Sequence, residues 1–142
     1  MNYTSRMSIF MSGRLTSPTS TELRHGPSGA LLETTAPKDN GGDGSRFSPT
    51  DLCTASAASC AATTVSLYAT RNGIPLTSIG FEIEKHMTAE LPRRIAKLVA
   101  RFRISSPCGD EDFRKLVHAG RTCPVFRSLH PDVLVEDVWE RG

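Results

Sequence analysis

Four cysteines are the residues whose type and spacing offer the clearest chemistry: Cys53, Cys60, Cys108 and Cys123. Cys53 and Cys60 are seven residues apart, which in a helix is two turns and about 10.5 Å of rise. A disulfide needs Cα atoms closer than about 7 Å, so these two cannot pair with each other. Two thiolates that share a zinc ion must lie closer than 10 Å as well. Because the four histidines are scattered and no C-x-x-C occurs, we expect no zinc site.

Cys60 and Cys123 occupy the two most informative settings. Cys60 lies in Ala58-Ser59-Cys60-Ala61-Ala62, where it is either a small buried hydrophobe or a nucleophile. Cys123 lies in Thr122-Cys123-Pro124-Val125, where one helix ends and another turn begins, so its thiol is more accessible than one in mid-helix. A nucleophilic Cys60 needs a cation from outside its helix, because the helix dipole fades after the first turn. The candidates are Arg14, Arg24, Arg93 and Arg94.

Composition indicates a single globular domain. The chain has 142 residues, 38% hydrophobic and 23% charged, and we expect a flexible leader at 1–12 and one domain at 13–142. A net charge of +2 is too small to favour nucleic acid. We see no apolar run near the ~18 residues of a membrane span, and the polar start lacks the apolar core of a secretory signal. We therefore expect a cytoplasmic protein with reduced cysteines.

Turn residues and hydrophobic periodicity predict an α+β fold in which helices cover an antiparallel sheet. Gly26-Pro27-Ser28-Gly29 forms a turn between two strands, and a loop follows at 36–47. Ser48 is typical of an N-cap and Gly73 of a helix end, so we expect a buried helix from Ser48 to about Asn72, covered on several faces. The expected strands are 20–24, 30–35, 79–84, 96–104 and 133–139, the third and fourth forming a hairpin. A second helix at 111–121, capped by Asp110, and a helical turn at 123–129 complete the prediction.

Several of these stretches together resemble the OsmC/Ohr family, the osmotically inducible protein C and organic hydroperoxide resistance proteins. The resemblance runs from about Leu23 to Trp139. Its most specific part is Ser59-Cys60 in an alanine-rich helix, followed some sixty residues later by Cys123-Pro124-Val125. The supporting motifs are His25-Gly26-Pro27-Ser28-Gly29, Asp39-Asn40-Gly41-Gly42, Ser48-Pro49-Thr50-Asp51-Leu52, Pro92-Arg93-Arg94-Ile95 and Ser128-Leu129.

The resemblance implies an intertwined homodimer, with antiparallel sheets packed around two central helices and two active sites at the dimer interface. It implies reduction of organic hydroperoxides by a cysteine pair, in which Cys60 matches the peroxidatic and Cys123 the resolving cysteine. The family's site also has a carboxylate at the start of the central helix, a position that Asp51 occupies, and an N-terminal arginine, for which Arg24 and Arg14 are the candidates. It further implies a dithiol reductant, such as a lipoylated protein, and no bound cofactor.

Three other functions stay open at this point. Asp51 is one methylene shorter than the family's usual glutamate, which favours an OsmC-fold member without peroxidase activity that acts as a binding or interaction domain. The same thiols are also compatible with detoxification of another electrophile. Nucleic-acid binding is the third function, but strand alternation spreads the basic residues along one face without aromatic partners. Those basic residues are Arg93, Arg94, Lys97, Arg101 and Arg103.

Overall fold

The computed structural model describes residues 8–142, and the chain divides into two compact units, one ending at Thr50 and the other running from Asp51 to Gly142. The first unit holds an antiparallel sheet of β1 (Met11–Ser17), β2 (Ser20–His25) and β3 (Leu31–Thr35), in that order, and a short 3-10 helix, η1 (Lys38–Asn40). The strands β2 and β3 confirm the two expected near the N-terminus. We did not predict β1, and the remaining expected leader, residues 1–7, lies outside the described residues.

The N-terminal sheet has one apolar face. Strand register places Gly13 opposite Leu23 and Leu23 opposite Leu32, so alternate residues from the three strands gather on this face. Its apolar members are Met11, Leu15, Leu23 and Leu32, and all four are exposed. The buried residues of the three strands are instead Thr34 and Thr35. This unit therefore buries little apolar surface of its own.

The predicted long helix is confirmed as α1 (Pro49–Arg71). It begins directly after Ser48, with proline at its first position, where the missing N–H costs nothing. It ends before Gly73, whose φ of +65° lies in the left-handed region that favours glycine at a helix end.

The second unit holds a sheet in the order β4 (Ser78–Met87), β5 (Ile95–Ser105) and β6 (Leu134–Arg141). The predicted antiparallel hairpin is β4–β5, whereas β6 runs parallel to β5, which we did not predict. A parallel return needs a long crossover, and α2 (Asp110–Arg121) and α3 (Pro124–Ser128) provide it. Asp110 was wrongly expected to cap α2: Gly109 is the N-cap, and Asp110 is the first helical residue.

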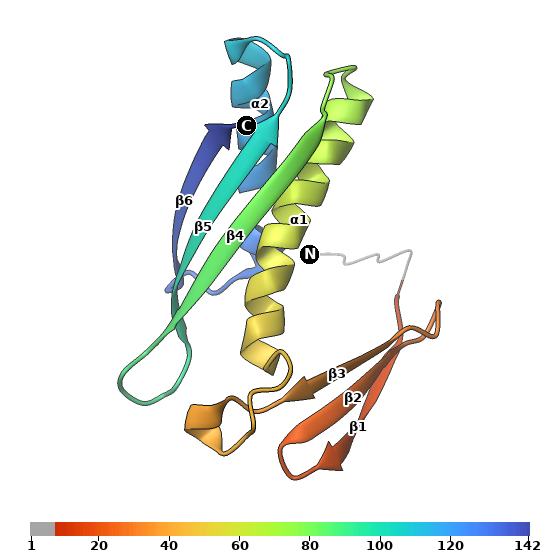
Figure 1. The fold of residues 1–142 in the computed structure, drawn as a ribbon, viewed down its shortest axis with the longest axis vertical. Helices are drawn as coiled ribbons and strands as arrows, with labels where there is room; N and C mark the ends of the chain where they lie inside the picture. Colours follow the sequence, from red (N-terminus) through yellow and green to blue (C-terminus); the bar gives the residue numbers. More distant parts are fainter. Residues whose placement is uncertain (1–7) are drawn as a thin grey trace, which may run out of the picture. The chain divides into compact units, whose positions relative to one another are not determined.

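Helices α1 and α2 cover the same face of the β4-β5-β6 sheet (Figure 1). The core residues of β5 alternate along the strand and are fully buried: Leu98, Ala100, Phe102 and Ile104. Small side chains on α1 let the helix approach this face closely, with Ala58 and Ala61 in one cluster with Ala100 and Phe102. Further along, Val65 and Ala69 pack with Ile104 and with Leu116 of α2.

Only one face of α1 is buried in the single chain. Our expectation that several faces of this helix are buried is therefore wrong for the single chain. The opposite face is exposed and carries small polar residues at helical spacing: Ser56, Ser59, Thr63, Ser66 and Thr70. By length and composition α1 is also the one helix among residues 8–142 that could cross a membrane. Its buried alanines pack against the sheet, which is the behaviour of a core helix.

Trp139 fixes the contact between β6 and α2. Its ring stacks on Phe102, with centroids 3.9 Å apart and planes 8° from parallel, and its indole Nε1 donates to Asp137. The six-membered ring of the indole also lies against Gly120 of α2, where a Cβ would come within 2.2 Å of it. Glycine at position 120 therefore creates the space that the indole ring fills.

We predict that Gly120→Ala lowers the free energy of unfolding by about 1–3 kcal/mol. The added methyl group overpacks the core, and this cost exceeds the stability that alanine adds through its higher helix propensity. Urea unfolding measures the change. Gly80→Ala is the matched control, since a Cβ at Gly80 meets no atom within 4 Å. Equal stability of the two variants would contradict the conclusion that Gly120 creates the space for the Trp139 ring.

Candidate active site

The thiol of Cys123 is held between two helices. Cys123 is the N-cap of α3, and its Sγ accepts a hydrogen bond from the Phe126 N–H at 3.4 Å, as a serine or aspartate oxygen would. Pro124 follows at the first helical position. The same sulfur lies 4.0 Å from the carbonyl oxygen of Ala57 on α1, and the residue is fully buried. The start of α3 thus fixes the Cys123 thiol against a specific turn of α1.

That turn is the one that the Cys60 side chain covers. In a helix each Cα–Cβ bond tilts toward the N-terminus, so a side chain lies over the turn before its own Cα. For Cys60 that turn contains Ala57, the residue whose carbonyl Cys123 approaches. Cys60 packs against the buried cluster that contains Cys123, and its side chain is close enough to Cys123 to influence the pKa of that thiol. The structure therefore brings together the two cysteines singled out in the sequence, both as free thiols.

The environment of Cys123 raises its pKa above the ordinary value of 9.0. Burial is the largest cause, because removal from water disfavours the thiolate. The Phe126 N–H acts in the opposite direction, and the neighbouring Cys60 side chain raises the pKa further. Cys123 consequently keeps its proton at neutral pH, and its thiol is less nucleophilic than an ordinary cysteine thiol.

Asp51 forms an ion pair that we did not predict. Its Oδ1 lies 2.5 Å from Nζ of Lys85 on β4, and the Lys85 side chain is only 18% exposed. Nine helical positions separate Asp51 from Cys60, which is half a turn out of phase and about 13.5 Å along the axis. Within one chain, Asp51 therefore joins the start of α1 to β4 and does not reach the thiol pair. Sequence reasoning missed Lys85, because its place in the alternating pattern of β4 suggests only an ordinary strand position.

The contacts of the candidate arginines within the chain do not test whether one of them stabilises the Cys60 thiolate. Arg24 is exposed on β2, opposite Ser12 and Leu31, and Arg14 on β1 pairs with Glu22 at 3.2 Å. Arg94 donates to the backbone carbonyls of Ile95 and Asp132, which suits a structural role in the β4–β5 loop. Helix α1 itself carries only Asp51 and Arg71 as charged residues. A cation for Cys60 must come from another element, and the assignment to Arg24 or Arg14 stays a prediction.

The two remaining cysteines lie outside the thiol pair. Cys53 is exposed, because it lies on the outer face of α1. Cys108 is half-buried against the cluster around Leu116. Among residues 8–142 there is no group of three His, Cys, Asp or Glu side chains placed to hold a metal ion.

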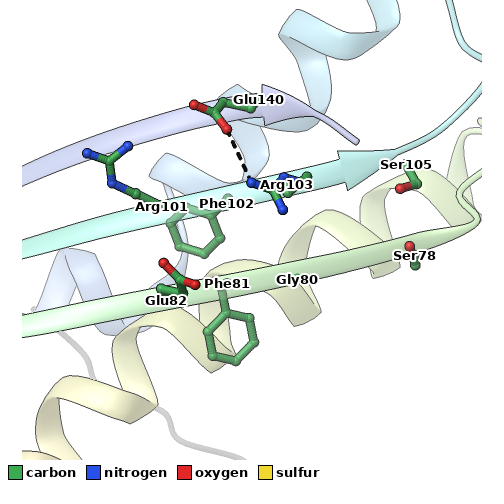
Figure 2. A pocket seen from close by; sticks show the side chains of 9 residues that line it. All are labelled: Ser78, Gly80, Phe81, Glu82, Arg101, Phe102, Arg103, Ser105 and Glu140. Carbon is green, nitrogen blue, oxygen red and sulfur yellow. Dashed lines mark ion pairs between the residues drawn. The ribbon is translucent and has the colours of Figure 1, made fainter.

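The basic residues of β5 lie on the outer face of the sheet among carboxylates. Lys97 pairs with Glu136 at 3.5 Å and Arg103 with Glu140 at 3.8 Å, while Glu82 stands opposite Arg101 in the strand register. A hollow of about 420 Å³ lies on this face. Figure 2 shows its charged side chains, which are Arg101 and Arg103 together with Glu82 and Glu140. Nucleic acid requires a continuous basic surface, so this mixed face disfavours that alternative.

Comparison with known proteins identifies the family. Residues 42–136 match the family model for OsmC-like proteins. The chain belongs to the OsmC-like family. A candidate osmotic stress induced and detoxification response protein from Psychrobacter arcticus 273-4 is 30% identical, with a TM-score of 0.86 over 97% of this chain and 99% of that one. No curated protein matches the chain.

More distant OsmC-like structures share the fold. An organic hydroperoxide resistance protein OsmC from Legionella pneumophila is 17% identical, with a TM-score of 0.74 over 96% of this chain and 98% of that one. An organic hydroperoxide resistance protein from Elizabethkingia anophelis is 13% identical, with a TM-score of 0.78 over 98% and 99%. The expected α+β OsmC-like fold is therefore confirmed.

The raised pKa of Cys123 predicts a pH dependence of stability. A thiol that is harder to ionise in the folded state stabilises the fold below its unfolded pKa, and this stabilisation is lost as pH rises through the folded value. The free energy of unfolding of the reduced protein should therefore fall above pH 9, by up to about 1.4 kcal/mol per pH unit for this one proton.

Urea unfolding between pH 7 and pH 10.5 in the presence of a reductant measures this effect. Cys123→Ala should fall less steeply than the unsubstituted protein, whereas Cys53→Ala, which removes an exposed thiol, should match it. Parallel pH curves for the unsubstituted protein and Cys123→Ala would show that the buried thiol is not perturbed.

Proposed function

We propose that this protein is a thiol-dependent peroxidase that reduces organic hydroperoxides. The observation that carries the proposal is that Cys60 packs against the buried cluster of Cys123, whose sulfur lies 4.0 Å from the Ala57 carbonyl oxygen one turn before Cys60. Membership of the OsmC-like family and the likeness to organic hydroperoxide resistance proteins support it. The reaction needs a supply of reduced dithiol, which fits a cytoplasmic location.

In the first step the Cys60 thiolate attacks the outer oxygen of the hydroperoxide. The O–O bond breaks, Cys60 becomes a sulfenic acid, and the departing alkoxide takes up a proton to leave as an alcohol. The half-buried position of Cys60 allows the substrate to reach its sulfur. The protonated, buried Cys123 is the poorer attacking group and is left for the next step.

In the second step Cys123 resolves the sulfenic acid. Its sulfur attacks the Cys60 sulfur, a Cys60–Cys123 disulfide forms, and the hydroxyl group leaves as water with the Cys123 proton. The packing of Cys60 against the cluster of Cys123 limits the motion that this step requires. An external dithiol, for which a lipoylated protein is our candidate, then reduces the disulfide by exchange and is itself oxidised to a disulfide.

The Cys60 thiolate needs a positive neighbour, and we assign this role to Arg24, with Arg14 as the second candidate. The charge would stabilise the thiolate and orient the hydroperoxide. Asp51 would position the cation, in addition to its contact with Lys85. In the single chain Asp51 and Cys60 are half a helical turn out of phase, so this arrangement requires a carboxylate from a second chain.

We therefore also propose a homodimer. The exposed face of α1, with Ser56, Ser59 and Thr63, offers a close-packing surface for another helix. The apolar face of the N-terminal sheet, which exposes 71% of Leu15, would gain cover from a second copy.

The alternative of a binding or interaction domain without peroxidase activity is less well supported. Such a domain would place no requirement on Cys60 and Cys123, and the two cysteines would have no reason to share one cluster. Their packing in one cluster is instead the arrangement that a two-cysteine cycle requires.

Steady-state reduction of cumene hydroperoxide with dihydrolipoamide as reductant tests the proposal. Cys60→Ser should lower kcat at least a thousandfold, because the nucleophile is lost. Cys123→Ser should complete one turnover and then over-oxidise at Cys60, which mass spectrometry detects as a sulfinic acid.

Cys53→Ser is the matched control, since it changes an exposed thiol on the same helix. It should keep the kcat of the unsubstituted protein. Full activity in Cys60→Ser, or an inactive unsubstituted protein, would overturn the proposal.

A further inference from the structure

A second candidate site lies between α2 and the end of β6. It is a hollow of about 450 Å³ lined by Phe113, Arg114, Val117, His118, Arg121 and Trp139. None of the four cysteines lines it, so it is separate from the thiol pair. Three of its six residues carry basic side chains, and the other three are apolar or aromatic. This combination is typical of a site for a ligand with both a charged and an apolar part.

The apolar floor of the hollow is held rigidly. Stacking on Phe102, contact with Gly120 and the hydrogen bond to Asp137 fix the Trp139 ring. Phe113 is fixed in turn by the Arg141 guanidinium, which lies 4.4 Å from its ring centroid. A ligand that binds here would find a preformed surface and would not have to order it.

The basic side chains lie on one face of α2, at positions 114, 118 and 121. Arg121 is already paired, with its Nε 2.7 Å from Asp137. The side chains of Arg114 and His118, in contrast, make no hydrogen bond or ion pair with any residue between 8 and 142. The nearby acidic residues Glu111 and Asp112 are engaged with Lys115. Two donors therefore remain available at the rim of an aromatic hollow.

We propose that this hollow binds a small amphipathic organic anion. Its carboxylate accepts hydrogen bonds from the Arg114 guanidinium and the His118 imidazole, and its hydrocarbon part lies on Val117, Phe113 and Trp139. The hollow on the outer face of the sheet is of similar size but does not fit this ligand, because Glu82 and Glu140 balance its arginines (Figure 2). The difference in charge between two similar hollows selects the α2–β6 hollow for anions.

Titration with octanoate tests the proposal, because Trp139 is the only tryptophan of the chain and its fluorescence reports directly on this site. We expect a saturable change in Trp139 fluorescence. Octanamide has the same chain without the charge and should bind about tenfold more weakly, since a charge-assisted contact is lost. The double variant Arg114→Gln, His118→Gln should weaken octanoate binding by about tenfold or more and octanamide binding by much less, since only octanoate loses a charge-assisted contact.

Arg101→Gln is the matched control, because it removes an exposed arginine from the other hollow. It should not change the octanoate affinity. Three results would each overturn the proposal: no saturable fluorescence change, equal affinities for octanoate and octanamide, or an unchanged octanoate affinity in the double variant. Both substituted side chains are at the surface, and circular dichroism of the double variant confirms that it is folded.

Discussion

The contact between one turn of α1 and the start of α3 is the constraint on which the functional account depends. The Cys123 sulfur takes the place of an N-cap oxygen at the start of α3, and it lies against the Ala57 carbonyl group of α1. The side chain of Cys60 covers the same turn of α1, because helical side chains point toward the N-terminus. The sheet holds the two helices together. Alanines on α1 allow a close approach to β5. The contact between Trp139 and Gly120 fixes α2, and Cys123 follows α2 in the chain.

Burial then distinguishes the two sulfurs chemically. The sulfur on α1 is half-buried, whereas the sulfur at the start of α3 is fully buried and keeps its proton. Two thiols of equal reactivity would compete for a peroxide. In the proposed cycle the difference between them sets an order of events, with attack at the first sulfur and resolution by the second.

The sequence predicted those parts of the structure that local chemistry determines. Ser48, Pro49 and Gly73 mark the ends of α1, and alternation along β5 identifies its buried face. The parallel direction of β6 could not be predicted, because an alternating strand has the same pattern in either direction. The strand β1 was not predicted, because it has only two large apolar residues, Met11 and Leu15. Its strand conformation depends on pairing with β2, which the local sequence does not show.

The thiol pair was predicted by family resemblance, and no periodicity argument could have joined residues 63 positions apart. The partner of Asp51 was not predicted, since Lys85 contacts it through folding of distant segments. The position of Arg101 and Arg103 on one face of their strand could be predicted, because alternation along β5 already separates them from the core.

The most direct test of the central claim is to oxidise the reduced protein with one equivalent of cumene hydroperoxide and map its disulfides by mass spectrometry. A mixture of nitrogen-15-labelled and unlabelled protein distinguishes bonds within one chain from bonds between chains. The account predicts one dominant disulfide, Cys60–Cys123, within a single chain. A disulfide that involves Cys53 or Cys108 instead, or a Cys60 that over-oxidises without forming any disulfide, would contradict it.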